Sequence, residues 1–206
     1  YDCYTGFKWI AAVIRDNEGV GRYLGGGEES YGFLAEDFCR DKDAVSAISL
    51  MAEALAWAKT KGMNFLQMLQ DIYIKYGYSR EAGVSLVRKG KSGAEEIIAI
   101  MKEFRANPPK QIAGSDVVIV KDYADLNMKN LKTGEVTKMD MPTTSNVLQY
   151  FTEDGTKISI RPSGTEPKIK FYVEVKGSMK TNADYADANN KADAKIEAVK
   201  KDLGID

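Results

Sequence analysis

Histidine is absent from this chain of 206 residues, and cysteine and proline are scarce, with two and five residues. Without histidine, any proton transfer by this chain must use lysine, aspartate, glutamate or tyrosine. Cys3 and Cys39 are too few for a disulfide framework, so we expect both to be packing residues in a reduced, cytoplasmic protein. The chain also lacks an apolar run long enough to span a membrane and a basic-then-apolar signal segment, so we expect no membrane partner.

The overall charge is close to zero, with 29 basic and 30 acidic residues and a formal net charge of -1. This balance argues against a general nucleic-acid surface, so any anion must be met by a local cluster. The segment from 161 to 176 provides one, because its four cations outnumber its two carboxylates. The first residue is a tyrosine rather than a methionine, and we expect the chain to be a fragment of a longer protein.

Apolar residues recur at helical spacing in the first part of the chain. Asp43 is suited to cap one helix, which Gly62 ends, and a second helix begins near Asn64 and ends before Gly77. We expect both to be core helices. Their expected buried residues are Val45, Ile48, Ala52 and Leu55 in the first helix and Leu66, Leu69, Ile72 and Tyr76 in the second.

A change of domain is expected near residue 78, with a short apolar strand at 84–87 after it. Residues 92–95, Ser-Gly-Ala-Glu, resemble a capping box for a third helix, which Pro108 and Pro109 end. The apolar spacing predicts that this helix buries Ile97, Ile98, Met101 and Phe104.

Beyond the prolines the apolar period changes from helical spacing to strict alternation, which predicts strands at 117–120, 147–151, 156–160 and 168–175. Asp154-Gly155 is typical of a hairpin turn. A C-terminal amphipathic helix, from about Tyr185 to Leu203, can cover one face of the resulting sheet. Strands with helices before and after them indicate an α+β layout.

The segment Arg161-Pro-Ser163-Gly164-Thr165-Glu-Pro has the composition of a phosphate-binding loop. A guanidinium can donate to two phosphate oxygens at once, and a glycine lets backbone N–H groups approach an anion closely. Lys170, in the following strand, can help to neutralise the same anion. By composition alone, a polar turn between strands and a solvated Lys170 are the alternatives.

Three further segments carry candidate site residues near the N-terminus. Gly26 to Gly32, Gly-Gly-Glu-Glu-Ser-Tyr-Gly, offers Glu28 to sugar hydroxyls, because a carboxylate accepts from hydroxyls and repels phosphate. Residues 40–43, Arg-Asp-Lys-Asp, contain Lys42, the best candidate for a general acid or base in a histidine-free chain, although such a run is more often a solvated helix start. The third segment is residues 5–9, Thr-Gly-Phe-Lys-Trp.

These segments together resemble those of the alpha-D-phosphohexomutases, the phosphoglucomutase and phosphomannomutase family. The resemblance implies that Ser30, Thr5 and Lys8 contact the sugar together with Glu28. The resemblance implies that residues 1–77 are the end of domain 3, an α/β domain with a mixed sheet and the sugar loop. It also implies that residues 78–206 are domain 4, an α+β domain like the TATA-binding protein, with an antiparallel sheet and the phosphate loop. The activity implied is interconversion of hexose 1-phosphate and hexose 6-phosphate through a phosphoserine and a bisphosphate intermediate.

The same resemblance implies parts that this sequence does not contain. We find neither the family's Ser-His phosphoserine motif nor its Asp-Gly-Asp metal loop, so we expect Mg²⁺ to bind on upstream domains 1 and 2 of the same polypeptide. Glucose 1,6-bisphosphate is the implied activator and intermediate, and a hexose phosphate is the implied substrate. We therefore expect this chain to be inactive alone.

Two other interpretations remain open from the sequence. A phosphopentomutase or a glucose-1,6-bisphosphate synthase would use similar loops. The family's phosphoglucosamine mutases tend to have Gln-Ser-Gly-His where residues 29–32 are Glu-Ser-Tyr-Gly, so a glucosamine substrate agrees less well with this sequence. A non-catalytic sugar-phosphate-binding module would also explain both loops.

Overall fold

The computed structural model describes residues 1–28, 31–88, 90–164 and 166–205. The chain divides into two compact units, Tyr1–Leu69 and Gln70–Asp206. Helix α3 (Phe65–Tyr76) runs across the sequence boundary between them. The domain boundary expected at residue 78 stays a prediction.

The first unit contains helix α1 (Phe7–Asp16), the antiparallel pair β1 (Gly26–Gly27) and β2 (Phe33–Leu34), and helix α2 (Ala44–Thr60). Its core is a small cluster of Phe7, Ile14 and Leu34. Asp43 caps α2 as predicted, because its carboxylate accepts hydrogen bonds from the N–H groups of the second and third residues after it. Gly62 follows the helix with a φ of 69°, which a glycine adopts without strain.

The prediction that α2 and α3 are core helices is wrong for this structure. Val45 is 72% exposed, Ile48 69% and Tyr76 74%, and Leu55, Leu66 and Ile72 are exposed as well. The apolar spacing predicts a surface suited to burial, but the small core cluster of the first unit contains no residue of α2 or α3. Cys3 and Cys39 are also exposed rather than packed, because both lie in segments outside that cluster.

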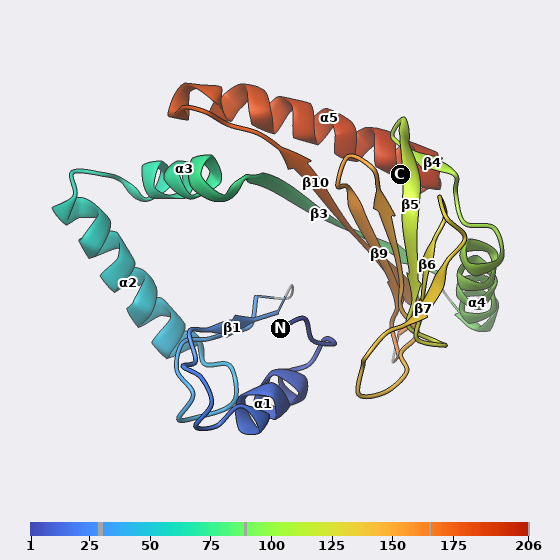
Figure 1. Ribbon diagram of the computed structural model, residues 1–206, viewed down its shortest axis with the longest axis horizontal. Helices are drawn as coiled ribbons and strands as arrows, with labels where there is room; N and C mark the ends of the chain where they lie inside the picture. Colours follow the sequence, from blue (N-terminus) through green and yellow to red (C-terminus); the bar gives the residue numbers. More distant parts are fainter. Residues whose placement is uncertain (29–30, 89, 165, 206) are drawn as a thin grey trace. The chain divides into compact units, whose positions relative to one another are not determined.

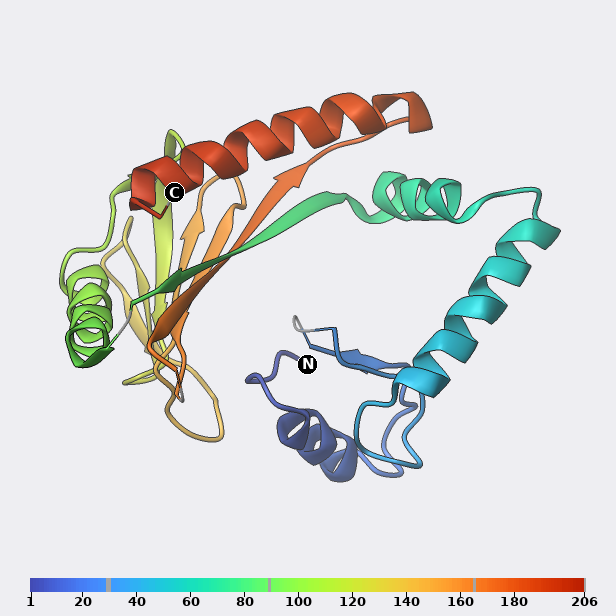
Figure 2. The ribbon, with the colours of Figure 1, turned by 180° about the vertical axis from the view of Figure 1, so that it is seen from behind.

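The second unit is an α+β arrangement of an antiparallel sheet and helices, as predicted. The sheet order is β3-β10-β9-β8-β5-β6-β7, and β4 pairs with β5. Helices α4 and α5 cover the same face of the sheet (Figures 1 and 2). The elements are β3 (Tyr78–Val87), α4 (Gly90–Ala106), β4 (Gln111–Ile112), β5 (Ser115–Asp122), β6 (Asn127–Asn130), β7 (Val136–Lys138), β8 (Leu148–Thr152), β9 (Lys157–Pro162), β10 (Lys168–Gly177), the short helix η1 (Asn182–Asp184) and α5 (Tyr185–Leu203).

Strand β10 shows the alternation that its sequence predicts. Ile169, Phe171, Val173 and Val175 are buried under the helices, whereas the residues between them are half-buried on the opposite face. That opposite face is polar: the Tyr123 hydroxyl donates to Gln149 Oε1 at 3.0 Å, and Gln149 Nε2 donates to Ser159 Oγ at 3.0 Å. The sheet therefore separates an apolar core from a polar face.

Three expectations for this unit are corrected. Helix α4 begins at Gly90, so Ser92 lies inside the helix and is not its N-cap. A Cβ at Gly93 would lie 2.5 Å from the Arg88 carbonyl carbon, which shows that the first turn packs closely onto the preceding backbone. Ile98 is 68% exposed, because Ile97 and Met101 occupy the side of α4 that faces the sheet. The strand expected at 84–87 is longer, since β3 pairs with β10 along its whole length.

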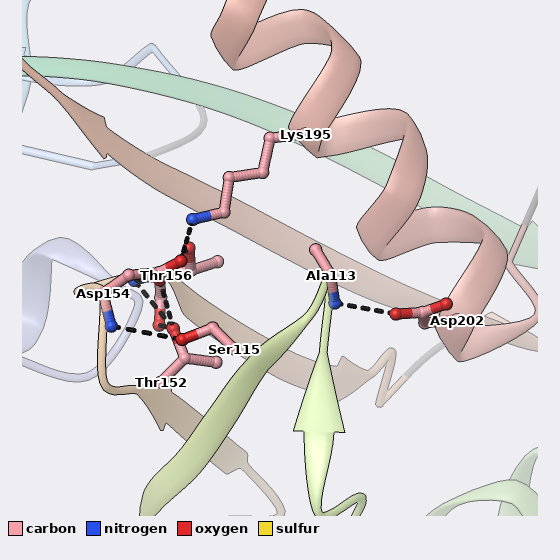
Figure 3. Close-up of polar contacts among 7 residues, drawn as sticks. All are labelled: Ala113, Ser115, Thr152, Asp154, Thr156, Lys195 and Asp202. Atoms are coloured by element: carbon pink, nitrogen blue, oxygen red, sulfur yellow. Dashed lines mark hydrogen bonds and ion pairs between the residues drawn. The ribbon is translucent and has the colours of Figure 1, made fainter.

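Asp154 joins the β8–β9 hairpin turn to α5 (Figure 3). The hydroxyls of Thr152 and Thr156 donate to Asp154 Oδ1 at 2.7 and 2.9 Å, and Lys195 of α5 forms an ion pair with Oδ2. Burial by itself would raise the pKa of Asp154. The ion pair and the threonine hydrogen bonds outweigh it and hold that pKa well below its usual range. This hairpin turn, predicted from Asp154-Gly155, therefore also fixes the helix.

We expect Asp154→Asn to lower the free energy of unfolding at pH 7 by about 1–2 kcal/mol, a modest figure because the side chain is 40% exposed. A depressed pKa stabilises the fold above the ordinary aspartate pKa of about 4 and loses that contribution as the pH falls. The variant should therefore show a weaker loss of stability between about pH 4 and pH 2. Urea denaturation at pH 7 and pH 3 measures this.

The matched control for this experiment is Asp193→Asn. Asp193 lies on the same helix, α5, and forms an ion pair with Arg80 of β3. The side chains of Arg80 and Asp193 are 44% and 52% exposed, so we expect a change of less than about 1 kcal/mol. Equal effects of the two variants at both pH values would contradict the role assigned to Asp154.

Candidate functional site

The predicted phosphate loop forms the turn between β9 and β10, in the second unit. Arg161, near the end of β9, lies directly opposite Lys170 of β10 in the antiparallel register. Both residues are half-buried on the polar face of the sheet, because the neighbouring Ile160 and Phe171 point into the core. Like charges directly opposite each other are destabilising, and an anion bound beside both would relieve that repulsion.

Backbone hydrogen bonds hold this turn on both sides. Ser163 N–H donates to the Lys168 carbonyl at 2.8 Å, and Arg88 N–H, just beyond β3, donates to the Pro167 carbonyl at 2.9 Å. Ser163 Oγ accepts from Glu166 N–H at 3.2 Å. Gly164 is exposed at the tip, where a Cβ would meet nothing within 4 Å. The turn is thus anchored at its base and open at its tip. Thr165 lies outside the described residues.

The predicted sugar loop places Glu28 at the centre of a cluster in the first unit, which we call the Glu28 cluster: Gly6, Phe7, Glu28, Gly32 and Lys42. Gly6 N–H donates to Glu28 Oε1 at 2.7 Å, and Lys42 Nζ donates to Oε2 at 3.2 Å. Only 7% of the Glu28 side chain is exposed. Its backbone N–H donates to the Gly32 carbonyl at 2.8 Å. The carboxylate is therefore held rigidly by its own loop and by α1. Ser30 lies outside the described residues.

Lys42 reaches this cluster because its neighbours hold the backbone before α2. Asp41 Oδ1 accepts from Lys42 N–H at 2.8 Å, and Asp43 caps the helix. The ammonium lies 5.2 Å from the centre of the Phe7 ring, within range of a cation–π interaction. The Arg-Asp-Lys-Asp run thus combines the helix start expected of any such sequence with one lysine directed at a carboxylate.

Thr5 and Lys8 flank the cluster. Thr5 is exposed and precedes Gly6, whose N–H binds Glu28. The Lys8 ammonium instead lies 4.9 Å from the centre of the Trp9 ring. The structure thus places Lys42 at Glu28 and Lys8 over an aromatic ring, and a sugar contact by Thr5 or Lys8 stays a prediction.

Two sequence models of one family match this chain. The model described as phosphoglucomutase/phosphomannomutase alpha/beta/alpha domain III matches residues 1–76, and the model described as phosphoglucomutase/phosphomannomutase C-terminal domain matches residues 105–192. The chain belongs to the phosphoglucomutase/phosphomannomutase family. The resemblance inferred from the loop sequences is thereby confirmed.

Individual members of the phosphoglucomutase/phosphomannomutase family agree with this assignment. The chain is 38% identical over 172 residues to a phosphoglucomutase of Staphylococcus haemolyticus, which covers 82% of this chain. It is 39% identical over 172 residues to a phosphoglucomutase of Staphylococcus aureus strain MRSA252, with 84% of this chain covered. The chain spans 31% of the length of each of these relatives.

A solved structure supports the fold. The open form of the exocytosis-sensitive phosphoprotein pp63/parafusin, a phosphoglucomutase from Paramecium, matches 97% of this chain and 33% of its own, with a TM-score of 0.52. At 17% sequence identity, this likeness concerns the fold alone.

Among the residues that the structure describes, no three histidine, cysteine, aspartate or glutamate side chains come together as metal ligands. The described residues therefore do not by themselves form the Mg²⁺ site that the family implies. No helix in the described part of the chain is both long and apolar enough to cross a bilayer.

Sequence reasoning missed four positions that shape the two sites of this family member: Gly6, Phe7, Gly32 and Arg88. The first three stand inside segments already singled out, but nothing in their identity indicates that they surround one carboxylate. Arg88 has no local signal, because its hydrogen bond to the loop carbonyl depends on the pairing of β3 with β10.

Proposed function

We propose that this chain supplies the sugar-recognition and phosphate-recognition parts of a phosphohexomutase that interconverts hexose 1-phosphate and hexose 6-phosphate. The observation that carries the proposal is the placement of Arg161 opposite Lys170, beside a turn whose tip is open. Two cations on one polar face favour a dianionic phosphate over a neutral ligand. The relatives named phosphoglucomutase support glucose as the hexose.

In this proposal the second unit binds the phosphate group that is not being transferred. Arg161 donates two parallel hydrogen bonds, Lys170 adds positive charge, and the Ser163 hydroxyl and the backbone around Gly164 add further donors, with Thr165 as an additional contact. Phosphoryl transfer has a loose transition state in which proteins mainly position groups and stabilise charge. Holding the distal phosphate therefore contributes to catalysis by orienting the sugar.

The first unit recognises the sugar through Glu28, with Ser30, Thr5 and Lys8 as further proposed contacts. A carboxylate that is nearly buried and already fixed by Gly6 N–H is preorganised to accept hydrogen bonds from hydroxyls. Lys42 is the proposed general acid or base, because an ammonium near a reacting hydroxyl can donate a proton and, once neutral, accept one.

The remaining parts of the reaction are proposed to come from other domains of a longer, cytoplasmic polypeptide. These parts are the phosphoserine and the Mg²⁺, which would neutralise charge on the phosphoryl group, with glucose 1,6-bisphosphate as intermediate. The partners of this chain are then a hexose phosphate and domains 1 and 2 of the same protein, not a nucleic acid or a membrane. The chain by itself should lack mutase activity.

Titration with glucose 1-phosphate, followed by NMR on the isotope-labelled chain, tests this function. We expect the amide resonances of Gly164 and Gly6 to shift with saturable curves, and we expect no formation of glucose 6-phosphate. Inorganic phosphate should shift Gly164 and leave Gly6 in place. Unmoved Gly164 and Gly6 resonances would refute the recognition role, and turnover by a preparation free of contaminating mutase would show that the catalytic groups are misplaced.

A further inference from the structure

The carboxylate assigned to the sugar accepts hydrogen bonds from two groups of this chain. Glu28 Oε1 accepts from Gly6 N–H, and Oε2 accepts from Lys42 Nζ at 3.2 Å. The Glu28 side chain is 7% exposed, whereas that of Lys42 is 53% exposed. Lys42 is therefore the more accessible partner of the ion pair, and a sugar hydroxyl that binds Oε2 must replace its hydrogen bond.

The packing around this ion pair leaves room for Lys42 only because residue 32 is a glycine. A Cβ on Gly32 would lie 2.9 Å from Lys42 Cδ, 2.9 Å from Phe7 Cε2 and 3.0 Å from Glu28 Oε2. The aliphatic part of Lys42 thus lies against the Gly32 backbone, and its ammonium lies over the Phe7 ring. Contacts with the Gly32 backbone and the Phe7 ring therefore position the lysine beside the carboxylate.

We propose that Lys42 occupies the sugar-binding oxygen of Glu28 in the free protein, and that the sugar displaces it. The inference rests on the proposed function of this cluster. Because the Lys42 side chain is half exposed, its ammonium regains water when it leaves the carboxylate, and this lowers the cost of the exchange. Sugar binding and the release of Lys42 are then one coupled event.

This competition predicts different effects of one substitution on two ligands. Lys42→Met removes the competitor for Glu28, so a neutral sugar, methyl glucoside, should bind about two- to fivefold more tightly, in keeping with a partly exposed ion pair. Inorganic phosphate, which is proposed to bind at the loop of the second unit, should keep its affinity in the same variant. NMR titration of the Gly6 amide, whose N–H contacts Glu28, measures the first dissociation constant, and the Gly164 amide measures the second.

Two variants serve as controls. Lys59→Met makes the same chemical change at an exposed position of α2, and both dissociation constants should match those of the unmodified chain. Lys42→Arg retains the positive charge, so neutral-sugar binding should return toward that of the unmodified chain.

The possible outcomes separate this inference from the proposed function. If Lys42→Met leaves methyl glucoside binding unchanged or weakens it, the lysine does not compete for Glu28, and the competition is refuted while the site stands. If the unmodified chain shows no movement of the Gly6 amide with methyl glucoside, the proposed sugar site and the competition are refuted together.

Discussion

Arg161→Lys is expected to weaken binding of glucose 1-phosphate to this chain by about tenfold to a hundredfold. The substitution keeps the charge but removes the planar fork that donates two parallel hydrogen bonds, and a charge-assisted hydrogen bond contributes about 1.5–3 kcal/mol. In a longer enzyme that contains this chain, the loss should appear in kcat/KM by a similar factor. NMR titration of the Gly164 amide measures the binding effect directly.

The control for Arg161→Lys is Arg80→Lys, which makes the same exchange in β3, on the helix-covered side of the sheet where Arg80 pairs with Asp193. We expect phosphate affinity to be unchanged in that variant. An Arg161→Lys chain that binds glucose 1-phosphate as tightly as the unmodified chain would mean that the β9–β10 loop has a structural role only.

Ile97→Ala is expected to lower the free energy of unfolding of the second unit by about 2–5 kcal/mol. Ile97 is 6% exposed in the cluster that joins α4 to the sheet, so truncation removes buried apolar surface and leaves a cavity. The adjacent Ile98 is 68% exposed, and Ile98→Ala should cost less than about 1 kcal/mol. Urea denaturation, followed by circular dichroism, compares the two variants.

This pair of variants tests the helical phase of α4 directly. Helix propensity affects both positions alike, because the same residue types are exchanged at neighbouring sites of one helix. Similar losses at the two positions would show that Ile98 is buried in solution, as its sequence spacing predicted, and would contradict the packing of α4 described above.

Local features of the fold followed from the sequence because their causes are local. The Asp43 cap needs only a carboxylate before a helical run, and the Asp154–Gly155 turn needs only residues suited to a tight hairpin. The alternation of β10 identified its buried face. The amino-acid sequences of the loops that contain Glu28 and Arg161 were specific enough to indicate the family.

Other elements were missed because their signals are weak or short. Helix α1 begins inside residues 5–9, which were singled out only for their motif, and it continues to Asp16. Strands β4, β6 and β7 have between two and four residues each, too few for a period to emerge. Ile98 was assigned to the buried stripe because four apolar residues at helical spacing define a face only approximately. Burial depends on which other elements the helix meets.

The sequence alone determined which residue types can bind a phosphate and a sugar, and roughly where strands and helices form. Only the tertiary structure decided that Arg161 lies opposite Lys170, that Lys42 binds Glu28 with its ammonium over the Phe7 ring, and that Lys195 fixes the Asp154 turn. These contacts join residues of different strands, loops and helices. Strand register and helix docking set those of the second unit through the burial of apolar side chains such as Phe171 and Ile97, and the Phe7 cluster does so in the first unit. No local pattern encodes that choice.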